Sequence, residues 1–454
     1  MGAWRTWRSW QYRGGLGQHI LTLYGAQGFG RWLGRGFWAV TDQGLFAVSN
    51  FALNVLLARW LTPQDYGAFA VAFAVFLLLG TFHSALLIEP MLVFGPGRYR
   101  GRLSEYVGVL LYGHSGFAVL GSLVLLLAGV GVRLAGAGGL SAVLWSLAVA
   151  CPFILFLWLM RRACYIRLEP QLAASGGVLY LTLMVVGVCA LYQRQGLSAV
   201  SALGVMGCSS LATGLWLAIR LHVGQPPVKS GGLVHEVLGD HWDYGRWAVA
   251  SSTLSWASSN ICYLLLPVWG GLEASAAFKA LMNLLMPLLQ ANTAFSALLV
   301  PTLVRARRAG GFGRRVRLAL ALFTLDSAFY GVLLGLFHPQ LMTWLYGGQY
   351  QEYARVLWPL GFSLLVSGAI DVLGAALRAL ERPDRIFWVQ VLGAVVTLTL
   401  GLGFMAAWGV VGAGMGLLLS AAVRALALWA YYQRLEGTRS FEGEPHVVGT
   451  TQVL

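Results

Sequence analysis

The chain has 454 residues, of which 58% are hydrophobic and only 11% are charged, and its mean hydropathy is +0.69. Because soluble domains carry roughly 25% charged residues, this composition excludes a soluble globular protein and predicts an all-α polytopic membrane protein. The formal net charge of +14 would by itself also fit a nucleic-acid partner. The basic residues gather in short loops between apolar segments, however, which favours a membrane protein with no nucleic-acid partner.

The first 37 residues have no apolar core of the kind that a cleaved signal peptide needs. They place Trp4, Trp7 and Trp10 among several arginines, which is typical of a helix lying on the inner membrane surface. A basic tail without fixed structure is the alternative. We expect residues 1–37 to form an N-terminal segment ahead of the first spanning helix.

Residues 38–58 are long and apolar enough to span a bilayer, which takes roughly 20 mostly apolar residues, yet the segment also carries polar side chains. At about 100° per residue, Gln43, Asn50 and Asn54 share one helix face and Asp42 lies on the adjoining one. Polar groups that face lipid are costly, so this stripe should face other helices or a watery cavity. A hydrogen-bonded packing seam and a substrate cavity both fit this pattern.

Apolar segments of spanning length recur along the chain and predict twelve transmembrane helices. A Pro- and Gly-containing cytoplasmic linker at 222–244 divides them into lobes at 38–221 and 245–433, and residues 434–454 form a cytoplasmic tail. The predicted spans are 38–58, 67–92, 105–130, 140–160, 171–192, 198–220, 245–268, 275–304, 317–337, 354–378, 386–407 and 411–432.

The basic residues are distributed unevenly between the two sides that these spans define. If the N-terminus is cytoplasmic, the loops and tails on that side hold most of the 31 Lys and Arg residues. This asymmetry predicts a multi-pass protein of the bacterial inner membrane with both termini in the cytoplasm. The basic residues expected on the opposite side are only Arg59, Arg133, Arg194, Lys279 and Arg355.

The two halves resemble each other, which indicates an internal repeat. SALLIEPMLV from Ser84 returns as SALLVPTLV from Ser296. Pro170 and Pro383 are 213 residues apart, as are other pairs in the same order. Six helices per half return the chain to its starting side, so the halves should be parallel repeats related by a pseudo-two-fold axis along the membrane normal, with a cavity between them.

No motif for a metal, a cofactor or catalysis stands out. The five cysteines form no CxxC pair, and His235-Glu236 with Asp240-His241 lacks the HExxH spacing. No outward loop is long enough to hold catalytic residues. We therefore expect no metal, no cofactor and no enzyme activity.

The first span and the loop after it carry the family resemblance, in Asp42-Gln43, Ser49-Asn50-Phe51, Ala58-Arg59, Leu61, Pro63 and Tyr66-Gly67. This run resembles the polysaccharide transporter family, the Wzx-like flippases of the multidrug/oligosaccharidyl-lipid/polysaccharide (MOP) superfamily. With the twelve-helix plan, the resemblance extends over about residues 36–435. It implies that undecaprenyl-diphosphate-linked oligosaccharides are flipped across the membrane by alternating access, through a cationic cavity between two lobes.

Such a substrate needs cations for its diphosphate and polar groups for its sugars. Intramembrane carboxylates could also bind H⁺ or Na⁺ if transport is coupled to an ion. Candidates to line the cavity are Asp42, Gln43, Asn50, Asn54, Ser255, Ser259, Lys279, Asn283 and Arg378. Candidates for ion coupling are Glu89, Asp326 and Asp371, and candidates for the diphosphate at the inner mouth are Arg98, Arg100 and Arg102.

The alternative function is an ion-coupled multidrug or organic-cation antiporter of the same superfamily. That protein would need an acidic cavity lined with aromatic residues. The carboxylates within the spans keep this alternative open, and the family resemblance favours the flippase.

Overall fold

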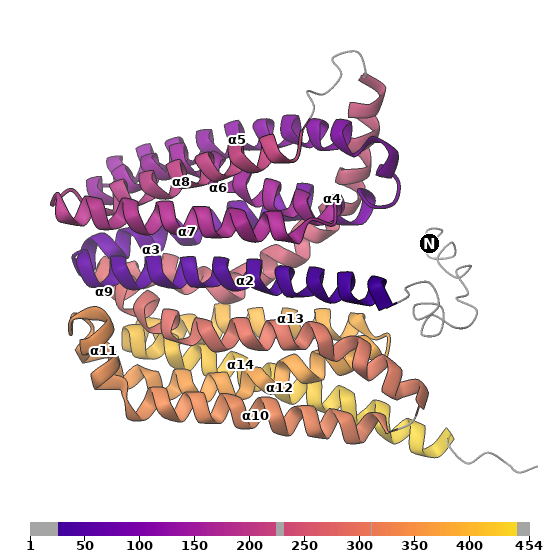
Figure 1. Ribbon diagram of the computed structural model, residues 1–454. Helices are drawn as coiled ribbons and strands as arrows, with labels where there is room; N and C mark the ends of the chain where they lie inside the picture. The colour runs from indigo at the N-terminus through magenta and orange to yellow at the C-terminus, as the bar shows by residue number, and fades with distance from the viewer. Residues whose placement is uncertain (1–25, 224–230, 310, 443–454) are drawn as a thin grey trace, which may run out of the picture.

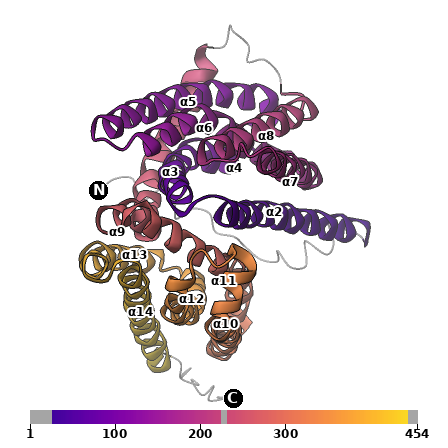
Figure 2. The same cartoon turned by 90° about the vertical axis from the view of Figure 1, so that its left-hand side faces the viewer.

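The computed structural model describes residues 26–223, 231–309 and 311–442, which fold almost entirely into helices and contain no strand. Nine helices of the described residues are long and apolar enough to cross a membrane. The helices form two lobes, and Figures 1 and 2 show the lobe with α2 to α8 above the lobe with α10 to α14. The predicted all-α two-lobe membrane fold is confirmed.

The first lobe contains α2 to α8 and includes two short segments of wider or tighter helix. Its bounds are α2 (Ala26–Trp60), α3 (Pro63–His83), the π-helix η2 (Ser84–Ile88), α4 (Glu89–Phe94), the 3₁₀ helix η3 (Arg100–Arg102), α5 (Leu103–Leu134), α6 (Gly138–Ile166), α7 (Pro170–Gln193) and α8 (Ala199–Arg220).

The second lobe begins within α9, whose first half packs on the first lobe and whose second half belongs to the second. Its bounds are α9 (Gly231–Ala309), α10 (Phe312–Leu336), α11 (His338–Tyr346), the 3₁₀ helix η4 (Gln351–Val356), α12 (Leu357–Ala379), α13 (Pro383–Val396), the π-helix η5 (Thr397–Gly401) and α14 (Leu402–Glu442).

Two of these long helices each contain two crossings. Gly271 in α9 has φ 65° and Gly409 in α14 has φ 55°, a backbone conformation that glycine adopts without the cost of a Cβ. At each glycine two helices meet across a kink. Counted separately on each side of these glycines, the nine apolar helices of the described residues provide eleven spanning segments. The predicted span 38–58 lies in α2, which carries more polar residues and is not among them.

The internal repeat is visible in the backbone as well as in the sequence. Leu168 and Glu381 lie 213 residues apart and have φ values of 60° and 63°, which is uncommon for residues other than glycine. The next residues are also alike, with φ −115° and ψ 59° before α7, and φ −120° and ψ 57° before α13. Pro170 and Pro383 then begin their helices. At this position the backbone N–H that proline lacks would have no partner within the helix.

The hydrophobic cores explain how the lobes are joined. We call the side that holds α11 the α11 side, and the side that holds the beginning of α2 and the end of α14 the terminal side (Figure 1). On the α11 side one buried cluster includes residues of both lobes, among them Phe69, Phe278 and Leu357. On the terminal side each lobe has its own cluster, around Tyr106 and around Leu377. The lobes therefore share a core at one end and separate toward the other.

The first half of α9 packs on the first lobe. The indole of Trp256 donates a hydrogen bond of 3.1 Å to the carbonyl of Ala74, and the buried His241 contacts the Leu86 carbonyl at 2.9 Å. The linker expected at 222–244 is thus helical from residue 231 onward and continues into the span. The expected segments 1–37 and 434–454 lie largely outside the described residues, but 26–37 belongs to α2 and 434–442 to α14.

Candidate functional site

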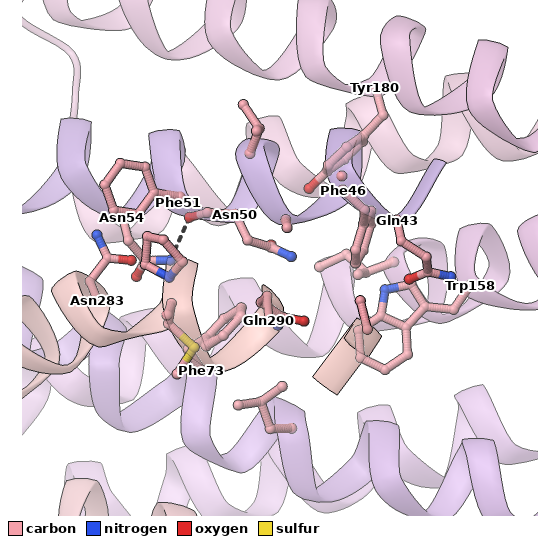
Figure 3. A pocket seen from close by; sticks show the side chains of 18 of the residues that line it. Gln43, Phe46, Asn50, Phe51, Asn54, Phe73, Trp158, Tyr180, Asn283 and Gln290 are labelled. Carbon is pink, nitrogen blue, oxygen red and sulfur yellow. Dashed lines mark hydrogen bonds between the residues drawn. The ribbon is translucent and has the colours of Figure 1, made fainter. Parts of the chain in front are cut away.

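A cavity of about 1000 Å³ lies between the lobes. We call it the central cavity. The first lobe supplies its walls from α2, α3, α6, α7 and α8, and the second half of α9 closes it from the other lobe (Figure 3). Its lining extends along α2 from Ala39 to Asn54, which is about 22 Å at the rise of an α-helix.

The polar stripe of α2 forms part of this wall. Gln43, Asn50 and Asn54 all line the central cavity, and Figure 3 shows them following one another along the helix. The amide of Asn54 donates to the Asn50 carbonyl at 2.8 Å, and the hydroxyl of Tyr66 donates to the Asn54 Oδ1 atom at 3.3 Å. These contacts fix the Asn54 side chain, and the Gln43 side chain contacts Tyr165, which also lines the cavity.

Lys279 of α9 is the one charged residue among those that line the central cavity in the described chain. Its Nζ atom lies 4.3 Å from the centroid of the Phe73 ring and 5.4 Å from that of Tyr263. Within the described residues it has neither an ion pair nor a hydrogen bond. Aromatic faces attract a cation but leave its hydrogen-bond donors free.

Three amide side chains of α9 complete the polar lining, and of these only Asn283 is a sequence-predicted candidate. Asn260 and Gln290 also line the cavity. Lys279, Asn283 and Gln290 follow at helical spacing on one face, as Figure 3 shows for the two amides. Extending the periodicity from Lys279 along α9 could have identified Gln290 from the sequence.

The structure places Asp42 away from the cavity. Its carboxylate accepts hydrogen bonds from Arg161 Nη2 at 2.8 Å and from the Tyr165 hydroxyl at 2.7 Å, and it is fully buried. The Arg161 guanidinium also lies 3.9 Å from the centroid of the Phe46 ring. Both Phe46 and Tyr165 line the central cavity, so Asp42 and Arg161 hold two parts of its wall and do not face a ligand themselves.

Ser255 and Ser259 line a second, smaller cavity of about 350 Å³. We call it the serine pocket. It lies between α3, η2 and the first half of α9, and its other polar residues are Thr81, Ser84, Glu89, Ser252 and Asn260. Leu77, Trp158 and Asn260 line both cavities, which are therefore neighbours.

The remaining candidates within the spans line neither cavity. Asp326 on α10 and Arg378 on α12 are exposed, and Asp371 is half-buried. Asp371 forms no ion pair with Arg378, which lies about 10 Å further along the same helix.

The three arginines expected at the inner mouth lie on the terminal side. Arg98 donates to Asp240 at 2.7 Å and to Glu236 at 3.0 Å, both in α9, and the neighbouring carboxylates raise its pKa. The hydroxyl of Tyr99 also donates to Asp240, at 2.7 Å, and burial with this contact raises its pKa. Arg98 is thus occupied by α9, whereas Arg100 and Arg102 are exposed in η3.

Direct contacts between the lobes close the α11 side. The guanidinium of Arg59 donates to the Trp344 carbonyl at 2.5 Å, and the amide of Gln349 donates to the Arg59 carbonyl at 2.9 Å. Near them, a Cβ added at Gly67 would come within 1.9 Å of the Leu272 carbonyl oxygen, so α3 and α9 touch through their backbones. Together with the shared core, these contacts seal the central cavity from this side.

Sequence comparison finds no match, either among protein families or among curated proteins. Solved structures do match. A multidrug resistance MATE family transporter of the MOP superfamily in an inward-facing conformation has a TM-score of 0.74 and 17% identity, covering 88% of this chain and 99% of that one. The lipid II flippase MurJ, in an inward closed conformation, has a TM-score of 0.70 and 12% identity, covering 87% of each chain.

A MATE family transporter in another conformation also matches. An outward-facing MATE family transporter has a lower TM-score of 0.60, with 16% identity and coverage of 89% of this chain and 95% of that one. These structural neighbours are transporters, not enzymes, and this chain, a multi-pass membrane protein, shares their two-lobe fold.

Proposed function

We propose that the protein is a flippase for lipid-linked oligosaccharides, which carries the diphosphate and sugars of an undecaprenyl-diphosphate-linked substrate through the central cavity. The observation that carries this proposal is the charge of the cavity. Its charged lining residue in the described chain is a cation without a counterion, Lys279. A diphosphate supplies the missing negative charge, and charge-assisted hydrogen bonds are about twice as strong as neutral ones.

The rest of the cavity suits the same substrate. Amide side chains along α2 and α9 can exchange hydrogen bonds with sugar hydroxyls, while Phe46, Phe73 and Met286 give it an apolar surface for the lipid. One structural neighbour with a TM-score of 0.70 is a lipid II flippase.

The antiporter is the weaker candidate because an organic cation needs negative charge where it binds. Asp42 is paired with Arg161, and Glu89, Asp326 and Asp371 lie outside the central cavity. A cationic drug in this cavity would meet Lys279 instead. Coupling to H⁺ or Na⁺ through one of these carboxylates remains compatible with either substrate.

We infer the orientation from the basic residues. The terminal side carries Arg98, Arg100, Arg102 and the arginines at the end of α9 and the start of α10, so it faces the cytoplasm of a bacterial cell by the positive-inside rule. The described arrangement then opens toward the compartment in which lipid-linked sugars are assembled.

Depletion of the protein tests the proposal directly. Lipid-linked saccharides should accumulate in the inner leaflet, and a plasmid copy with Lys279→Arg should reverse this while one with Lys279→Gln should not, because only arginine keeps the charge. Lipid-linked sugars are measured by mass spectrometry of extracts and by their accessibility to an external label. Unchanged lipid-linked sugars together with altered drug tolerance would instead favour the antiporter.

A further inference from the structure

We propose that the serine pocket is the subsite for the sugar chain of the substrate, separate from the diphosphate site at Lys279. This inference rests on the proposed function. It predicts that one cavity recognises the charged link and the other recognises the hydroxyl-rich part of the same molecule.

The serines that face the pocket differ from those that do not. The hydroxyls of Ser251 and Ser258 donate to backbone carbonyls of their own helix, at 3.1 and 3.0 Å. By contrast, the hydroxyls of Ser252, Ser255 and Ser259 form no hydrogen bond within the described residues. These three recur at intervals of three and four, so they lie on one face of α9 and leave their hydroxyls free for a ligand.

The opposite wall supplies a carboxylate. Glu89 is half-buried, and its carboxylate has no ion pair or hydrogen bond within the described chain. It follows the π-helix η2, whose wider turn links the Ser84 carbonyl to the Glu89 amide. In a regular α-helix residues five apart point in different directions, whereas the π turn brings Ser84 and Glu89 toward the same pocket. A carboxylate can accept hydrogen bonds from two neighbouring sugar hydroxyls.

Two tryptophans give the pocket flat apolar walls. Trp158 lies where the two cavities meet, packed on Gly80, where a Cβ would come within 2.8 Å of its ring. Its buried Nε1 atom has no hydrogen-bond partner within the described residues. Trp256 is held by its bond to the Ala74 carbonyl. Indole rings beside hydroxyl and carboxylate groups match a sugar ring, which has apolar C–H faces and a polar rim.

The dimensions favour a saccharide over a bare ion. A volume of 350 Å³ falls in the range of about 300–1,000 Å³ that is typical of pockets for organic ligands. A metal-ion site instead brings its oxygens to about 2.3–2.6 Å from one point. Asn260 lines both cavities and is three residues from Tyr263, which contacts Lys279. From Asn260 to Ser252 the pocket face extends about 12 Å along the helix, so the sugars would follow α9 away from the diphosphate.

A binding experiment with two probes separates this inference from the proposed function. The full chain in lipid nanodiscs is titrated with undecaprenyl diphosphate and with the undecaprenyl-diphosphate oligosaccharides extracted from the source cell. The saccharide-bearing lipid should bind more tightly, and the triple variant Ser252→Ala/Ser255→Ala/Ser259→Ala should weaken it by roughly tenfold or more while leaving undecaprenyl diphosphate unaffected. Glu89→Gln should act in the same direction. Ser251→Ala/Ser258→Ala is the matched control and should change neither affinity.

Lys279→Gln should weaken the binding of both probes by the same factor. If neither probe binds the unchanged protein, the proposed function fails and the inference fails with it. If both bind with equal affinity, or the triple variant leaves their ratio unchanged, the sugar subsite is wrong and the flippase stands. Binding of Na⁺ that Glu89→Gln abolishes, with an unchanged ratio of probe affinities, would identify the pocket as an ion site and would also overturn the inference.

Discussion

Two cations within the spans, Arg161 and Lys279, have similar aromatic neighbours and different partners. Arg161 lies 3.9 Å from the Phe46 ring and Lys279 lies 4.3 Å from the Phe73 ring. Arg161 also has a carboxylate, Asp42, at 2.8 Å, and is only 7% exposed. Lys279 has no such partner in the described chain and lines a cavity. We expect a cation with its own counterion to stabilise the fold, whereas one without a counterion can bind an anion of the substrate.

Removing the counterion should give the largest effect on stability. Asp42→Asn leaves Arg161 buried without a negative partner, which should cost about 3–5 kcal/mol of the free energy of unfolding. Thermal or denaturant unfolding of the purified protein in detergent measures this loss. The double variant Asp42→Asn/Arg161→Met should recover most of it, since two neutral side chains need no pairing. A single variant as stable as the unchanged protein would contradict a structural role for the ion pair.

Lys279→Met should separate function from stability. Because no partner is left unpaired, the free energy of unfolding should stay within about 1 kcal/mol of the original value or rise. Flipping of lipid-linked saccharide in proteoliposomes should fall by roughly tenfold or more, as a charge-assisted contact to the diphosphate is lost. A variant with a clearly lower free energy of unfolding that still flips lipid-linked saccharide would show that Lys279 has a structural role, like Arg161.

Substituting the aromatic neighbours should give smaller effects, one on binding of the substrate and the other on stability. Phe73→Leu removes the ring nearest Lys279 and should weaken binding of undecaprenyl diphosphate by about fivefold, or about 1 kcal/mol, with little change in stability. Phe46→Leu removes the ring beside Arg161 and should lower stability by a similar amount. Titration and unfolding of both variants test this, and equal effects of the two substitutions in either assay would remove the distinction.

Local periodicity identified the polar face of α2 but left open whether that face meets a packing seam or a cavity. Gln43, Asn50 and Asn54 recur at helical spacing, and a bilayer leaves such residues few places to face. The partner of Asp42 could not be found in this way. Arg161 is 119 residues away in sequence, and the rule that arginines collect on the cytoplasmic side already accounted for it.

The serines of α9 show a second limit of prediction from the sequence. An ideal periodicity groups Ser251, Ser255, Ser258 and Ser259 on one face, but the pocket is lined by Ser252, Ser255 and Ser259. The difference depends on how α9 is rotated against α3, and contacts such as Trp256 with the Ala74 carbonyl set that rotation. The same packing places residues 231–244 on the first lobe, although their composition is typical of a linker.

The matching turns before α7 and α13 show that the main chain, not the side chain, determines how these helices end. Leucine and glutamate share neither size nor charge, yet Leu168 and Glu381 hold the same unusual torsion at equivalent places in the two repeats. Gln195 and His222, which follow the ends of α7 and α8, hold the same left-handed torsion, so this helix ending recurs four times at non-glycine residues within the described chain. Main-chain hydrogen bonds to the last carbonyls of each helix hold these residues in place, so glycine should be accepted at all four positions without loss of the turn.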